Sequence, residues 1–216
     1  MAKQKSSKRE YDSTRRQAQA DETRRRILEA ARKTFMERGY AGATAEAIAA
    51  EADVAAQTIY AIFKNKKKLL VSLMNISPAT GVEDFTPMPE RSNVKAVSQE
   101  QDQRRQLKMF AEVVAANLDR VAVVSELMTD AAKTEPDFDR ILQKLNKQRL
   151  EHMTFAVQQI AVNGPFRENI EEAYARDTVW AFTSPEVFLL LTRDRGWSKE
   201  DYAQWLADML TRALLP

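Results

Sequence analysis

Two short segments with helical periodicity, residues 44–52 and 56–63, are separated by only three residues, and this spacing restricts the fold more than any other feature. A longer segment before them repeats apolar residues at helical spacing. Ile48 and Ile59 of the short segments can therefore meet Phe35 of the longer one in one small core. The pattern predicts a helix-turn-helix supported by a third helix.

The rest of the chain also favours helix. Its 216 residues include only 5 Gly and 7 Pro, and alternating β-branched clusters are scarce. We expect an all-α protein with an N-terminal three-helix helix-turn-helix domain that suits DNA binding and a C-terminal helical bundle. Further helices are predicted over residues 66–75, 98–118, 120–133, 136–162, 166–183, 185–194 and 198–214.

Changes in composition mark the domain boundaries. Residues 1–20 are polar and basic, and residues 77–93 contain four Pro or Gly residues without periodicity. The predicted parts are a basic flexible arm (1–20), the helix-turn-helix domain (21–75), a linker (76–97) and a C-terminal helical domain (98–216).

Charge is distributed unevenly between the two ends. Residues 1–75 carry 16 Lys and Arg against 9 Asp and Glu, whereas residues 76–216 carry 17 against 22. A basic first third suggests that this end meets a polyanion, although a solvated basic tail would give the same pattern.

The sequence argues against several other classes of protein. It has no Cys, which excludes disulfides, thiolate metal sites and a cysteine nucleophile. Its single His has no Glu three residues before it, and no Gly-rich phosphate loop is present. We therefore predict no catalytic site, no metal and no cofactor, although a site built from Asp and Glu alone stays open.

No apolar stretch resembles a membrane or export signal. The basic N-terminus is not followed by an apolar region, and the longest apolar runs, such as 187–191, are too short to span a bilayer. A cytoplasmic location without a membrane partner is predicted.

The second short helix of the motif is the candidate for reading DNA. The N-terminal part of such a helix enters the major groove, where Gln can pair with adenine and Thr or Ala methyl groups can touch thymine. Hydroxyl, phenol and ammonium groups around it suit phosphates. The predicted DNA-binding residues are Thr44, Ala55, Ala56, Gln57, Thr58, Tyr60, Lys64 and Lys66.

Residues 22–75 resemble the DNA-binding domain of the TetR family of transcription regulators. The matching positions are Ile27-Leu28-Glu29-Ala30-Ala31, Phe35, Gly39-Tyr40, Thr44, Ile48-Ala49, Val54, Thr58-Ile59-Tyr60, Phe63, Asn65-Lys66 and Leu69-Leu70. The resemblance implies a homodimeric repressor that binds a palindromic operator in double-stranded DNA and is released by a small-molecule effector. It also implies phosphate roles for Thr44, Tyr60 and Lys66, and a base-facing role for Gln57.

Three positions depart from the family pattern. Asp53 stands where the turn usually has Gly, and Asp tolerates a left-handed backbone better than most residues. Ala55 replaces the usual Ser cap, and Ile62 replaces the common His. These departures bear on the operator sequence more than on the fold.

The sensing pocket is expected where polar residues interrupt apolar helix faces in the C-terminal domain. Internal explanations are an ion pair between Arg149 and Asp177, or a bond from His152 to a backbone carbonyl. The predicted ligand-binding residues are Phe110, Asn117, Met128, Arg149, His152, Phe155, Asp177 and Trp180.

The last helix carries a broad apolar face, which could be core or could pair with a second subunit. Other functions compatible with the sequence are a three-helix unit that binds protein, a ligand-independent DNA-binding or nucleoid protein, and a TetR-like activator.

Overall fold

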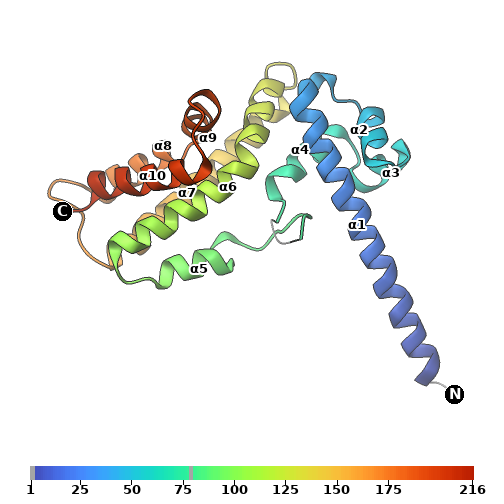
Figure 1. Ribbon diagram of the computed structural model, residues 1–216, viewed down its shortest axis with the longest axis horizontal. Coiled ribbons are helices and arrows are strands. Elements are labelled where there is room, and N and C mark those ends of the chain that lie inside the picture. The colour runs from blue at the N-terminus through green and yellow to red at the C-terminus, as the bar shows by residue number, and fades with distance from the viewer. Residues whose placement is uncertain (1–2, 78–79) are drawn as a thin grey trace. The chain divides into compact units, whose positions relative to one another are not determined.

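The computed structural model describes residues 3–77 and 80–216, with side chains described from residue 15 onward. The described residues are organised as helices joined by short loops, with an isolated β-bridge between Ile76 and Glu83. Two compact units are present, Met1–Phe85 and Thr86–Pro216 (Figure 1). The all-helical class expected from the sequence is confirmed.

The first unit contains the predicted helix-turn-helix. Its elements are α1 (Lys3–Gly42), α2 (Ala45–Ala52), α3 (Ala56–Phe63), α4 (Lys66–Ser72) and a short 3₁₀ turn (Leu73–Asn75). Within α1, Gly39 has φ 66°, a backbone conformation that glycine adopts without strain, and it bends the end of the helix. The core side chains, at most 3% exposed, include Ile27, Leu28, Phe35, Ile48, Ile59, Phe63, Leu69 and Leu70.

The helix α1 begins much earlier than the sequence predicts. Residues from Lys3 are helical, where a flexible arm over 1–20 was expected; Met1 and Ala2 lie outside the described residues. The segment before Gly39 has no Gly or Pro and is rich in Ala, Arg, Lys, Gln and Glu, which are strong helix formers. The scarcity of large apolar residues in residues 1–20 therefore does not prevent this segment from forming a helix.

The expected linker, residues 76–97, is also more structured than predicted. Residues 76 and 83 pair in the isolated bridge, a 3₁₀ turn spans Met88–Glu90, and α5 spans Ser92–Gln99. The last proline of this segment is Pro89, and the short helix α5 forms after it.

The second unit is a bundle around α6 (Gln103–Ala132). It also contains α7 (Asp137–Val162), α8 (Glu172–Phe182), α9 (Pro185–Leu189) with a following π-helical turn (Leu190–Asp194), and α10 (Lys199–Leu214). The predicted helices 98–118 and 120–133 are one helix from Gln103 because no Gly or Pro interrupts it. The helix expected from residue 166 begins at Glu172, after a loop in which Asn169 has φ 67°.

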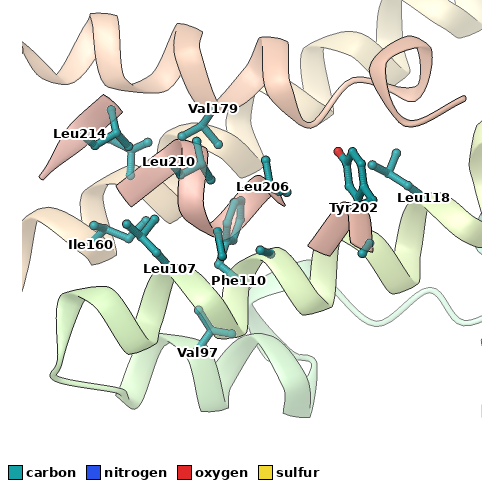
Figure 2. Packing of buried hydrophobic residues seen from close by; sticks show 14 of the residues in the cluster. Val97, Leu107, Phe110, Leu118, Ile160, Val179, Tyr202, Leu206, Leu210 and Leu214 are labelled. Carbon is teal, nitrogen blue, oxygen red and sulfur yellow. The ribbon is translucent and has the colours of Figure 1, made fainter. Parts of the chain in front are cut away.

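The apolar face of α10 belongs mainly to the core of its own chain. Tyr202, Leu206, Leu210 and Leu214 are fully buried, and Figure 2 shows several of them beside Leu107 of α6. Among the described helices, none combines the length and apolar character needed to cross a bilayer.

Candidate functional site

The turn between α2 and α3 has the geometry of a helix-turn-helix. Thr44 caps α2 by accepting a hydrogen bond from the Ala47 amide at 3.1 Å. Asp53 ends α2 in the left-handed region, with φ 52° and ψ 53°. Asp is one of the few residues other than Gly that enters this region readily, so the turn forms without glycine.

Arg26 of α1 holds this turn in place. Its guanidinium donates hydrogen bonds to the carbonyl oxygens of Ala52, at 2.6 Å, and Asp53, at 3.1 Å. It therefore satisfies carbonyls that the end of α2 leaves without helical partners. This role of Arg26 cannot be predicted from the sequence, because Arg26 and the turn meet only after α1 packs on α2.

The predicted recognition helix α3 presents its two sides differently. Ile59 and Phe63 are 1% and 3% exposed and face the core. Ala55 and Gln57 are exposed, and the Tyr60 side chain is 48% exposed. Two of the four predicted base-reading positions, Ala55 and Gln57, therefore lie on the outer side, and the other two, Ala56 and Thr58, are half-buried.

The two predicted phosphate-binding lysines have different surroundings. Lys64 is exposed and ends α3 with φ 67°. Lys66, at the start of α4, donates to the Tyr40 carbonyl at 2.8 Å and lies 4.3 Å from the centre of the Tyr40 ring. Its ammonium group therefore links α4 to the end of α1 within the chain.

An ion pair attaches the segment after α4 to α1. The Arg24 guanidinium donates two hydrogen bonds to the Glu83 carboxylate, one of them at 2.6 Å, and the Glu83 side chain is 3% exposed. Arg24 also lies 4.5 Å from the centre of the Phe63 ring. Burial raises the pKa of Glu83, but hydrogen bonds from Arg24 and Ser72 outweigh it and leave that pKa below its usual value.

The predicted ligand-binding residues separate into three environments in the second unit. Phe110 and Met128 are buried, at 7% and 0% exposure. Asn117 is exposed and accepts a hydrogen bond from Arg120 at 2.9 Å. Asp177 is exposed and pairs with the neighbouring Arg176. Neither polar residue points to a shared pocket, because the helices turn both toward solvent.

Arg149 and Trp180, in contrast, come together between α7 and α8. Arg149 donates to the Trp180 carbonyl oxygen at 2.7 Å, and its guanidinium carbon lies 4.2 Å from the centre of that indole ring. The expected ion pair between Arg149 and Asp177 is therefore wrong. The sequence spacing allowed it, but the exposed Asp177 pairs with Arg176 instead.

The other two predicted residues of α7, His152 and Phe155, are half-buried. Burial lowers the pKa of His152, and the positive charge of Arg91 lowers it further. Both effects favour the uncharged form of the imidazole.

Part of the first unit matches a known protein family. Residues 27–73 match the family described as bacterial regulatory proteins, tetR family. The match lies wholly within the first unit and covers less than a quarter of the chain. No curated protein matches this chain.

Solved structures of TetR-type regulators share the fold at low sequence identity. NalD, the secondary repressor of the MexAB-OprM multidrug efflux pump in Pseudomonas aeruginosa, is 18% identical, with a TM-score of 0.62, covering 92% of this chain and 98% of its own. SmeT in complex with triclosan is 21% identical, with a TM-score of 0.63 and coverages of 90% and 92%. FadR from Bacillus subtilis in complex with stearoyl-CoA is 18% identical, with a TM-score of 0.62 and coverages of 86% and 96%.

Proposed function

We propose that this chain is a TetR-type transcription regulator, namely a cytoplasmic, dimeric, sequence-specific repressor that a small molecule releases from a palindromic operator. The exposed outer side of α3, with Gln57 and Tyr60 outward and Ile59 and Phe63 anchored in the core, is the observation that carries the proposal. A helix held in this way can enter the major groove without loss of its own packing. NalD, which shares the fold, is a repressor.

Dimerisation follows from the small size of the reading surface. One short helix contacts few base pairs, and two-fold symmetry doubles the contacts and sets the spacing of the half-sites. Trp205, Met209 and Ala213 form a half-buried row on α10, and Tyr174 of α8 is 60% exposed. We propose that a second copy of the chain covers these residues.

Release by a ligand requires only that the ligand prefer the conformation that does not bind DNA. A coupling free energy of about 1–3 kcal/mol is typical of such systems. SmeT and FadR, which share the fold, form complexes with triclosan and with stearoyl-CoA, and this supports a ligand-binding role for this chain.

The first test is selection of bound duplexes from a random DNA pool, followed by a salt titration on the selected sequence. We expect an inverted repeat whose affinity falls steeply as salt rises, because counterions are released from the phosphates. Weak binding without an enriched sequence would contradict the repressor and favour a nucleoid-type protein. A reporter gene that is switched on by the protein would instead identify an activator.

Two variants separate base reading from phosphate binding. Gln57→Ala is expected to cost about 1–3 kcal/mol and to relax preference at one operator position. Lys64→Ala is the matched control, because it should weaken binding to all sequences and lower the salt slope by about 1. Equal effects of both variants on all sequences would show that Gln57 does not read a base.

A further inference from the structure

Two buried hydrogen-bond donors in the second unit have no acceptor. They are Nε of Arg149 on α7 and Nε1 of Trp180 on α8, and among the described residues no other buried side-chain nitrogen or oxygen lacks a partner. Buried polar groups are almost always hydrogen-bonded, since a buried donor without an acceptor destabilises the fold. Two such donors on residues that touch each other therefore indicate a missing acceptor.

Arg149 also carries a charge that no neighbouring carboxylate balances. Within the described part of the chain no carboxylate forms an ion pair with it, whereas other arginines do so, namely Arg24, Arg25, Arg26, Arg105, Arg140, Arg176 and Arg193. Burial lowers the pKa of Arg149, and the charge of Glu186 on α9 opposes this only from a distance. Arginine nevertheless stays protonated in proteins, so the positive charge persists.

Nearby groups of the chain are already engaged with one another. The Tyr202 hydroxyl donates to the Phe182 carbonyl at 2.9 Å, and the Thr183 hydroxyl donates to the Val179 carbonyl at 2.8 Å. The Trp180 carbonyl oxygen is taken by the other end of the Arg149 guanidinium. No side chain or carbonyl of the described residues accepts from the two donors, so both are open to an acceptor from outside the chain.

The surroundings specify the chemistry of that acceptor. One donor is cationic and the other is neutral, which suits two adjacent anionic oxygens such as those of a carboxylate. The indole ring of Trp180 and the half-buried Met153 provide an apolar surface beside the donors, and Val179 next to them is fully buried. Arg149, Met153 and Trp180 are all partly exposed, so this part of the α7–α8 interface reaches the surface of the second unit.

We propose that the α7–α8 interface binds a small organic acid with an apolar body. Its carboxylate accepts hydrogen bonds from Nε of Arg149 and Nε1 of Trp180, and its apolar part packs against Trp180 and Met153. The effector role of this acid rests on the proposed function, in which a ligand releases DNA. Binding of the acid itself can be measured without DNA.

Calorimetric titration of the purified full chain tests the site. The probes are decanoate, 4-butylbenzoate and 1-naphthoate, each compared with its methyl ester, which keeps the body and removes the charge. We expect at least one acid to bind about tenfold or more tightly than its ester, because the ester cannot form the charge-assisted hydrogen bonds. Binding of no acid, or equal binding of acid and ester, would overturn the proposal.

Trp180→Phe is the sharpest variant because it keeps an aromatic ring over Arg149 and removes the unpaired donor. Trp180→Phe and Arg149→Met are each expected to weaken binding of the acid about tenfold. Two controls, Asp177→Asn at an exposed position and Trp197→Phe at another indole, should leave binding of the acid unchanged. Undiminished acid binding by Trp180→Phe would show that Nε1 does not hold the carboxylate and would refute the site.

The DNA assay keeps this inference separate from the proposed function. If an acid binds through Arg149 but does not release the selected operator, the binding site is supported. The same result would contradict release of DNA by a ligand, and the effector role proposed for the acid. Release of DNA by an acid that binds equally well to Arg149→Met would refute the site and leave ligand release standing.

Discussion

The beginning of α3 lacks a side-chain cap, and Ala55→Ser should supply it. Ala55 has the extended backbone of an N-cap residue, with φ −72° and ψ 143°, but its methyl group accepts no hydrogen bond. At other helix starts in this chain the cap side chain accepts one at 2.7–3.2 Å, namely Thr44, Asn65, Asp102, Ser184 and Ser198. Because Ala55 is exposed, a hydroxyl fits without displacing a neighbour.

The expected gain from Ala55→Ser is about 1 kcal/mol in the free energy of unfolding, the usual value of a Ser cap over Ala. In a chain of this size it corresponds to a rise in Tm of about 2–4 °C. Urea denaturation followed by circular dichroism measures it directly.

The matched control is Ala61→Ser, which makes the same chemical change at an exposed position inside α3. It should destabilise by about 0.5 kcal/mol because Ser is a poorer helix former than Ala. The two variants should therefore change the free energy of unfolding in opposite directions, which separates the effect of the cap from the lower helix propensity of Ser. A loss of stability in Ala55→Ser equal to that of Ala61→Ser would refute the reasoning about the cap.

Three further predictions concern the ion pair, the N-terminal helix and the dimer. Glu83→Gln should destabilise the first unit by about 1–2 kcal/mol, less than for a fully buried pair because Arg24 is partly exposed. The pKa of Glu83 is lower in the folded protein than in the unfolded chain, so the ionised Glu83 stabilises the fold above its unfolded-state pKa. This stabilisation is lost as the pH falls through the folded-state pKa of Glu83. Between pH 5 and 3, Glu83→Gln should therefore lose less free energy of unfolding than the natural sequence, as measured by urea titration at each pH. Removal of residues 1–20 should weaken DNA binding and lower the salt slope by about 0.9 for each phosphate that the shortened protein no longer neutralises; an unchanged slope would mean that this part of α1 does not touch DNA. Met209→Glu should convert the proposed dimer into monomers, as measured by sedimentation equilibrium. Gln204→Glu, at an exposed position of α10, is the control and should leave the dimer intact. A dimer that survives Met209→Glu would place the interface elsewhere.

The helix-turn-helix could be predicted almost completely from the sequence. Apolar periodicity, the Thr44 cap and the short turn are local signals, and residues close together in the chain produce them. The left-handed backbone at Asp53 agrees with the expectation for a residue at the usual glycine position. The stabilising contacts of Arg26 were missed because they join α1 to a turn 26 and 27 residues away.

The ligand-binding residues were harder to predict. Helical periodicity places Asn117, Arg149 and Asp177 near apolar faces, but a small rotation of a helix decides whether such a side chain turns inward or outward. The structure turns Asn117 and Asp177 outward and leaves Arg149 against Trp180, 31 residues away in sequence. No local pattern distinguishes these outcomes.

The sequence by itself determined that this chain is helical, where its helix-turn-helix lies and which side of α3 is exposed. Those properties depend on helix propensity, periodicity and caps, which act within a few residues. Only the tertiary structure decided that Glu83 meets Arg24 and that Arg149 and Trp180 share a buried site with two donors unpaired. Partners of that kind depend on how separate helices pack, and many packings satisfy the same local pattern.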